Sequence, residues 1–184
     1  MQRRTPLKYF YMALHPRVVV LVVAIDKEGK PNVMPASWTS PVCEEPPHIV
    51  LAMWRENYTW ELIKESREFT LNTPTADLVD IVWKAGTTSG REVDKSKLLN
   101  LTFSRSKSIK TPIIEECIAH LECKVVEEID VGESTLFIAE VVEAYGNEEY
   151  MVRGRWDLRK VEVLEHLGGR VFTVSTRVVY PRKK

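Results

Sequence analysis

The sequence is poor in the features that disulfide-stabilised, membrane-spanning or strongly charged proteins require. It has three cysteines, an odd number, and no export signal near its N-terminus, so we expect reduced thiols and a cytoplasmic location. Its longest apolar run, Val18–Ile25, has the length of a strand and is far shorter than the roughly 18–20 residues that cross a membrane. Lys and Arg number 26, as do Asp and Glu, and this balance argues against a nucleic-acid or anionic-membrane partner.

Several common motifs are also missing. There is no G-x-G-x-x-G, no P-loop, no H-E-x-x-H and no G-x-S-x-G, so the usual signatures of dinucleotide, triphosphate, zinc-protease and hydrolase sites are excluded. The four histidines are scattered and no Cys/His pair has the spacing of a zinc site. Cys117 and Cys123 are better explained as small buried apolar residues than as ligands. We therefore expect no metal site.

The sequence does contain the pattern of a folded chain rich in strands. Hydrophobic residues make up 44% and charged residues 28%, and the length of 184 residues predicts one domain over 1–184. β-branched runs and alternating apolar positions predict strands at 17–26, 31–39, 48–54, 68–73, 118–127, 135–145, 161–165 and 170–179. Helical spacing predicts short helices at 57–65 and 75–84.

Local composition refines this outline. The continuous apolar run at 17–26 predicts a strand buried on both faces. Pro31 and Pro35 cannot donate to a ladder, so the strand at 31–39 should lie at an edge or be irregular. Segment 41–47 (PVCEEPP) is interpreted as a stiff connection, and 86–97 as a long polar loop. The fold class is mainly β (α+β), a β-barrel or Greek key with short helices packed outside, because no βαβ alternation occurs.

Three short motifs in a fixed order resemble a known family. They are G-x-x-N-x-M followed by S-W-x-S and P-P at 29–47, Y-T-x-E-L-I at 58–63 and F-x-x-N-x-P at 69–74. This order resembles the flavin reductase-like domain family, FMN-binding split β-barrels of Greek-key type that include flavoredoxins and NAD(P)H:flavin oxidoreductases. The resemblance covers a core of about 17–145, with the C-terminal segment 146–184 completing the fold. Pro35 departs from the family pattern and removes one backbone N–H that could have faced a flavin.

The proline-broken segment 34–39 suits the wall of a flavin site. A planar ring with polar edges needs backbone N–H and C=O groups that a sheet ladder has not consumed, and proline interrupts such a ladder. The resemblance implies that FMN is bound here by Asn32, Ala36, Ser37, Trp38 and Thr39. The alternative for Ser37 and Trp38 is an ordinary strand with a core tryptophan.

A phosphate needs N–H donors and positive charge, and the start of the first expected helix offers both. Arg55 can make a bidentate phosphate contact, while Tyr58 and Thr59 add hydroxyl and N–H groups. Asn72, at a strand end, could reach the ribityl hydroxyls or a ring carbonyl. The alternatives are a surface role for Arg55, a helix cap for Thr59 and a turn before Pro74 for Asn72.

The resemblance also assigns a role to the polar loop at 86–97. In relatives a variable loop at this place covers the flavin, so Thr88, Ser89 and Gly90 are candidates for contacts to the phosphate or the ring edge. A solvated loop without ligand contacts is the alternative.

The resemblance implies that the flavin carries the chemistry, taking a hydride from NADH or NADPH, so that no catalytic side chain is required. Cys43 and His120 are the residues to test for proximity to the ring, and His166 is a weaker candidate. A flavoredoxin-like electron carrier reduced by a partner protein is the alternative, and a barrel without flavin is a third hypothesis. Relatives are commonly homodimers, and the arm at 9–12 and the first strand could form that contact.

Overall fold

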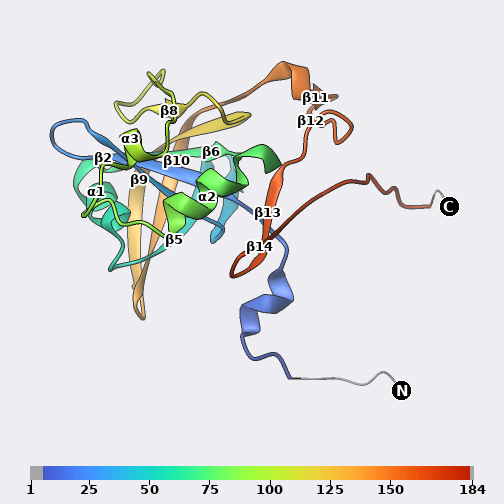
Figure 1. Cartoon of the computed structure of the whole chain (residues 1–184), viewed down its shortest axis with the longest axis horizontal. Coiled ribbons are helices and arrows are strands. Elements are labelled where there is room, and N and C mark those ends of the chain that lie inside the picture. Colours follow the sequence, from blue (N-terminus) through green and yellow to red (C-terminus); the bar gives the residue numbers. More distant parts are fainter. Residues whose placement is uncertain (1–5, 183–184) are drawn as a thin grey trace.

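The computed structural model describes residues 6–182, which fold around a seven-stranded antiparallel sheet (Figure 1). Its strands are β2 (Val20–Ile25), β3 (Pro31–Ala36), β4 (Thr39–Glu44), β5 (Pro47–Trp54), β6 (Glu68–Thr73), β9 (Ala119–Val131) and β10 (Ser134–Gly146). The strand order is β3-β2-β6-β9-β10-β5-β4, so hairpins β2–β3 and β4–β5 form its two ends. The mainly β fold class is confirmed.

Smaller elements surround this sheet. A three-stranded sheet contains β1 (Arg17–Val18), β13 (Leu164–Gly168) and β14 (Val171–Val174). Two short hairpins comprise β7 (Phe103–Ser104) with β8 (Ile113–Ile114), and β11 (Met151–Val152) with β12 (Arg155–Trp156). The helices are η1 (Phe10–Leu14), α1 (Tyr58–Ser66), η2 (Ala76–Leu78), α2 (Val79–Gly86), α3 (Lys95–Leu98) and η3 (Glu148–Tyr150). None of these helices combines the length and apolar character needed to cross a membrane.

Strand β2 is buried on both faces, as its continuous apolar run predicts. Val22 belongs to a core cluster with Leu51 of β5, while Val23 belongs to a second cluster with Val82 of α2. Strands β2 and β5 are separated in the sheet by β6, β9 and β10. Because Val22 and Leu51 nevertheless share a core, the sheet curls around the first cluster as a barrel does.

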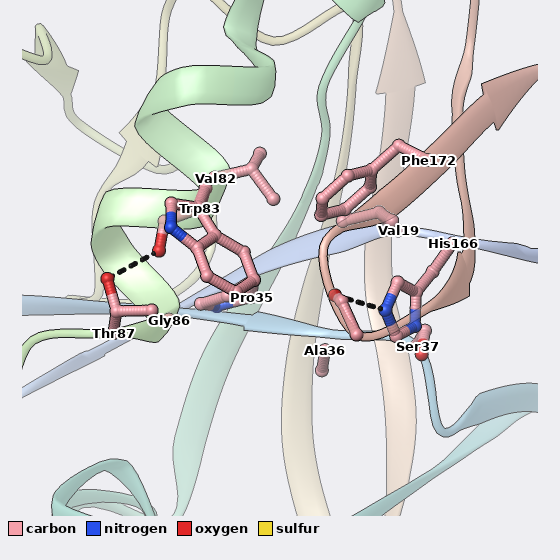
Figure 2. A pocket seen from close by; sticks show the side chains of 11 residues that line it. Val19, Pro35, Ala36, Ser37, Val82, Trp83, Gly86, Thr87, His166 and Phe172 are labelled. Atoms are coloured by element: carbon pink, nitrogen blue, oxygen red, sulfur yellow. Dashed lines mark hydrogen bonds between the residues drawn. The ribbon is translucent and has the colours of Figure 1, made fainter.

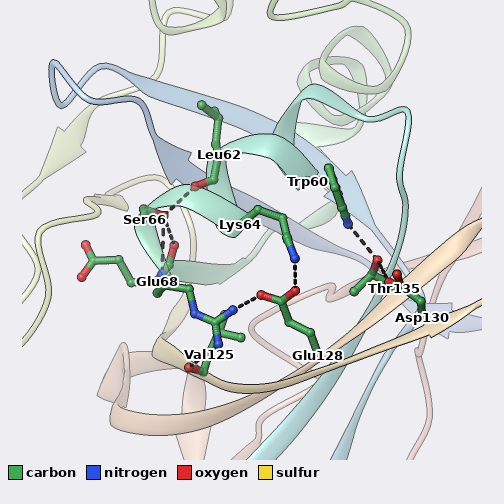
Figure 3. Close-up of polar contacts among 10 residues, drawn as sticks. Trp60, Leu62, Lys64, Ser66, Glu68, Val125, Glu128, Asp130 and Thr135 are labelled. Atoms are coloured by element: carbon green, nitrogen blue, oxygen red, sulfur yellow. Dashed lines mark hydrogen bonds and ion pairs between the residues drawn. The ribbon is translucent and has the colours of Figure 1, made fainter.

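Helix α1 is fastened to this barrel at both ends (Figure 3). The Trp60 indole N–H donates to the Thr135 hydroxyl on β10 over 2.9 Å. At the other end Lys64 and Arg67 both pair with Glu128 of β9. These contacts fix where the N-terminus of α1 points.

One expected connection is wrong. Segment 41–47 begins as strand, because β4 runs to Glu44 and pairs with β5, with Cys43 opposite His48. Pro41 is tolerated because β4 is an edge strand and needs hydrogen bonds on one side only. Strand β3 also lies at an edge, as its prolines predict, but it ends at Ala36 rather than at residue 39.

Other boundaries move for local reasons. Strand β9 runs to Val131 rather than to residue 127, β10 extends one residue beyond each expected end, and the two turn at Gly132, which has φ +57°. The loop at 86–97 contains the start of α3, capped by the Asp94 carboxylate, which accepts from Ser96 N–H at 3.1 Å. The last expected strand, 170–179, ends at Val174, and segments 6–14 and 175–182 project from the same side of the molecule (Figure 1).

Candidate functional site

Three hollows meet at Pro35, near the end of β3. We call the first the α1 hollow: it has a volume of about 430 Å³ and lies between the start of α1 and residues 85–91. The second, the Trp38 hollow, has about 720 Å³ and lies between residues 34–38 and the end of β5. The third, the Trp83 slot, has about 250 Å³ and lies between α2 and the β13–β14 hairpin (Figure 2). The first two also share Met34, Glu56 and Asn57, so together they form one continuous site.

The wall of the Trp38 hollow is backbone that the sheet leaves free. Strand β3 is an edge, Pro35 has no N–H, and regular pairing of β3 stops at Ala36. Ser37 and Trp38 follow as an irregular link, in which the Trp38 carbonyl accepts from Ala52 N–H over 2.9 Å. The Trp38 side chain is 46% exposed, so it is not a core tryptophan. This excludes the ordinary-strand alternative for Trp38.

The α1 hollow collects hydrogen-bond donors at the start of a helix. Asn57 occupies the N-cap position but its side chain makes no capping hydrogen bond, so the first N–H groups of α1 face the hollow uncapped. The Tyr58 and Thr59 side chains also line the hollow, as do Thr88 and Ser89 across it. A helix N-terminus with free N–H groups favours an anion.

Asn32 leaves one acceptor unused in the floor of this hollow. Its side chain is 5% exposed, and its amide donates to the Thr59 hydroxyl over 2.8 Å. Its Oδ1 atom is buried and has no hydrogen-bond partner. A Cβ atom added at Gly90 would lie 2.1 Å from that oxygen, so only glycine fits here. Burying an unpaired acceptor costs free energy, and a ligand hydroxyl would satisfy it.

Two cations and one carboxylate line the α1 hollow. Lys95 is 5% exposed, and its ammonium donates to the carbonyls of Val33 at 2.9 Å and Ala85 at 2.7 Å. Burial lowers the pKa of Lys95 to about 8. The Arg91 guanidinium donates to the Glu56 carbonyl over 2.9 Å and stacks on the Tyr58 ring. Glu56 is the one carboxylate in the lining, and Glu61, just outside it, pairs with Arg91 at 2.5 Å, so Lys95 is the cation of the hollow without a carboxylate partner among residues 6–182.

Two of the candidate residues make their contacts outside the hollows. Arg55 donates to the Gly132 carbonyl and pairs with Asp130 at 3.5 Å, so its guanidinium points to the β9–β10 turn rather than into the α1 hollow. Asn72 is fully buried, donates to the Leu21 carbonyl over 3.0 Å and accepts from Ile114 N–H. The Asn72 amide therefore cross-links the core.

Thr39 and two residues proposed to approach the flavin ring are also used elsewhere. The Thr39 hydroxyl donates to the Val50 carbonyl over 2.8 Å, inside the β4–β5 hairpin. Cys43 is exposed on β4, and its thiol donates a hydrogen bond to the Glu45 carbonyl. His120 is buried beside Asn72, with 2.9 Å between its Nδ1 and the Asn72 Oδ1, and burial lowers its pKa. His120 therefore packs in the core beside Asn72 and lines none of the three hollows.

His166 lines the Trp83 slot, where its Nε2 lies 3.2 Å from the Gly169 carbonyl. Burial lowers the pKa of His166, which keeps its imidazole neutral at pH 7.

The arrangement agrees with comparisons to known proteins. Residues 12–162 match the family described as flavin reductase like domain. The chain belongs to this family. An uncharacterized protein of Archaeoglobus fulgidus is 37% identical to it over 170 residues, which cover 92% of each chain. A second similar protein comes from Rhodococcus opacus. It is the reductase component of 4-nitrophenol 4-monooxygenase/4-nitrocatechol 2-monooxygenase, and it is 26% identical over 74% of this chain and 72% of its own.

The family likeness extends to the whole fold. Flavoredoxin from Methanosarcina acetivorans superposes with a TM-score of 0.85 at 29% identity, covering 98% of this chain and 95% of its own. The flavin reductase-like family binds FMN, and the split-barrel fold expected from the sequence is confirmed.

The residues present fit an FMN molecule. The α1 hollow offers what a phosphate needs, namely free N–H groups, hydroxyls and two cations, and Asn32 offers an acceptor for a ribityl hydroxyl. The Trp38 hollow offers the flat backbone wall that a ring needs. Sequence reasoning included Met34 in the wall at 34–39 but named neither Arg91 nor Lys95 as a phosphate contact. Both residues belong to the polar loop at 86–97. The available signal for a phosphate contact was the basic residue that follows Thr88–Gly90 in that loop.

Proposed function

We propose that this protein binds FMN and acts as an NAD(P)H-dependent flavin or ferric reductase. The observation that supports it most strongly is that the α1 hollow joins the Trp38 hollow at Met34 and Pro35. The first offers cations and a helix N-terminus, and the second offers a flat backbone wall. FMN supplies the redox chemistry when bound, accepting a hydride from a reduced nicotinamide and passing electrons to an acceptor. The protein then has to bind, orient and shield, which agrees with Cys43 and His120 lying outside the hollows.

Each part of the site has a distinct task in this proposal. Lys95, Arg91 and the first N–H groups of α1 hold the phosphate. Asn32 accepts a hydrogen bond from the ribityl chain through its unused Oδ1. Ala36, Ser37 and Trp38 would hold the ring by backbone contacts along the wall of the Trp38 hollow.

A flavoredoxin-like electron carrier is the second candidate. The similarity to the Methanosarcina acetivorans flavoredoxin over 98% of this chain favours it, because a carrier and a reductase share the same flavin site. In this case a partner protein, rather than NAD(P)H, reduces the flavin.

One spectroscopic experiment tests both candidates. FMN is added to the purified protein under anaerobic conditions, and its absorbance band is followed after addition of NADH and then NADPH. Bleaching within the mixing time supports the reductase, whereas slow bleaching of a tightly held flavin supports the carrier. A protein that leaves added FMN free in an ultrafiltration assay would refute both.

We also propose that two copies associate. Exposed apolar side chains gather on the segments that project from the barrel, where Phe10 is 76% exposed and Leu14 64% in η1, and Tyr180 is 74% exposed near the other end. Apolar surface of this kind is normally covered in a stable protein. A homodimer in the cytoplasm, with these segments at the contact, is the assembly we expect.

A further inference from the structure

The Trp83 slot lies on the α2 side of β3. Val33 packs in the core cluster that contains α2, whereas Met34 and Ala36 pack against the barrel cluster, as the alternation of a strand requires. Pro35 shares the orientation of Val33, and a Cβ atom added at Gly86 of α2 would lie 2.9 Å from its ring. The slot adjoins the Trp38 hollow through Pro35, Ala36 and Ser37 and the α1 hollow through Pro35, Gly86 and Thr87, while α2 and the β13–β14 hairpin supply the rest of its lining.

The slot has the shape of a ring-binding site. The Trp83 indole from α2 and the Phe172 ring from β14 stand on opposite sides of it, with Pro35 beside Trp83 (Figure 2). Val19 and Val82 complete an apolar lining. A cavity of roughly 150 Å³ holds a benzene molecule, so about 250 Å³ accommodates a planar ligand of one or two rings.

The charges around the slot are of one sign. Its lining contains no carboxylate. The Arg170 guanidinium lies over the Trp83 ring at 5.2 Å from the centroid. Arg17, which pairs in register with His166, lies over the Trp38 ring at 5.3 Å from the centroid and has a buried Nε without a hydrogen-bond partner. Neither arginine forms an ion pair with any residue in 6–182. A ligand with a negative charge would complement these guanidinium groups.

We propose that the Trp83 slot is a second ligand site, which takes a planar aromatic molecule of one or two rings bearing a carboxylate. The ring lies between Trp83 and Phe172, and the carboxylate faces Arg170. The proposal of this second site rests on the proposed function in one respect only. When FMN fills the Trp38 hollow, a ligand bound in the slot lies beside the redox centre, across Pro35–Ser37.

Benzoate and its neutral analogue benzamide are suitable probes. We would titrate each into ¹⁵N-labelled full-length protein saturated with FMN and follow the indole N–H signals of the five tryptophans. The Trp83→Phe variant assigns the Trp83 signal by its disappearance. We expect that signal to shift saturably with benzoate, and benzoate to bind about fivefold more tightly than benzamide because of the guanidinium contact.

Two variants separate the ring contact from the charge contact. Arg170→Gln should weaken benzoate about fivefold and leave benzamide unchanged, whereas Phe172→Leu should weaken both. Arg105→Gln changes an exposed arginine that does not line the slot, and should leave both probes unaffected.

Three results would overturn the proposal. They are the absence of a saturable Trp83 shift, equal affinity for benzoate and benzamide, or release of FMN as benzoate binds, which would make the slot part of the flavin site. The titration is repeated without FMN. A saturable Trp83 shift in a protein that fails to take up FMN would refute the proposed function and uphold the second site.

Discussion

Two arginines near the start of α1 differ in what their guanidinium groups can reach. Arg55 precedes the helix in sequence, but it is turned away by Asp130 and by the Gly132 carbonyl. Arg91 comes from a distant loop and lies along the α1 hollow, over the Tyr58 ring. Arg91 also pairs with Glu61 at 2.5 Å, but unlike Arg55 it lines the α1 hollow, so we expect Arg91 rather than Arg55 to contact a phosphate.

A matched pair of variants tests this difference. Arg91→Ala should weaken FMN binding about fivefold, or about 1 kcal/mol, because it removes a charge-assisted contact that is partly open to solvent. Arg55→Ala should change the dissociation constant less than twofold. Fluorescence quenching of FMN during titration gives both constants. The reverse order of effects would place Arg55, not Arg91, at the phosphate.

Lys95 is a buried cation whose ammonium contacts two carbonyls and no carboxylate. Burial disfavours the charged form, which is why the pKa of Lys95 falls to about 8 rather than the usual value near 10.5. A bound phosphate would stabilise the ammonium and raise that pKa. Binding of FMN and protonation of Lys95 are therefore linked.

The linkage has a definite sign. FMN affinity should be highest below pH 8 and fall as the pH rises through about 8, because the neutral amine attracts the phosphate less. Lys95→Met should weaken FMN about tenfold at pH 7 and flatten this pH dependence. Lys97→Met, on the same helix with an 85% exposed side chain, is the control. A wild-type affinity that stays constant from pH 7 to 9.5 would contradict the role of Lys95.

At the scale of elements, two strand carboxylates hold the irregular segment 105–111. Glu122 of β9 is fully buried and accepts from the backbone N–H groups of Lys107 and Ser108, each at 2.7 Å. Glu68 of β6 accepts from the backbone N–H of Thr111 at 2.7 Å. Buried carboxylates thus take the place of a ladder partner for a segment with no regular structure.

The charge of Glu122 should be measurable as stability. Burial alone would raise the pKa of Glu122, but the backbone N–H donors and the Tyr145 hydroxyl outweigh it and lower that pKa. A lowered pKa contributes stability above the unfolded value, near 4.5, and loses it as pH falls through the folded value. Glu122→Gln should therefore lower the free energy of unfolding by about 1–3 kcal/mol at pH 7, and by less below pH 4.

Urea unfolding at both pH values measures this effect. Glu127→Gln, an exposed position on the same strand, is the control and should cost little. An equal loss at both pH values would mean that the shape of Glu122, rather than its charge, holds the segment.

At the scale of the whole molecule, the barrel is well packed, but the segments of the chain before and after it are not. Segment 6–14 and the residues after Val174 carry exposed apolar side chains and project from one side (Figure 1). The Trp83 slot, which adjoins the proposed flavin site, lies near this side, since His166 and Phe172 of the C-terminal hairpin line it. An assembly of two copies would cover the apolar segments and limit solvent access to the site.

Light scattering after gel filtration tests the assembly. Wild-type protein should have about twice the mass of the 21.2 kDa chain. The double substitution Phe10→Glu and Leu14→Glu should shift it to the monomer, because it places charge in an apolar contact. Val126→Glu changes an exposed apolar residue on β9 and should leave the mass unchanged. A monomeric wild type would rule the homodimer out.

Much of the secondary structure follows from local pattern. The apolar run of β2, the alternation in β9 and the prolines of β3 each act through neighbours in sequence, so the strands, the edge position of β3 and the start of α1 were predictable. The family motifs likewise predicted the wall at 36–38. Segment 41–47 was misjudged because prolines at an edge strand look like prolines in a connection.

The sequence by itself determined the fold class, the family and the place along the chain of the proposed flavin wall. Only the tertiary structure decided which polar side chains reach that wall. Arg55 contacts a carbonyl 77 positions away, and Asn72 is joined to His120 across 48 positions, so neither role is written in local spacing. The physical reason is that a buried or charged group takes whichever partner the fold brings within hydrogen-bond distance.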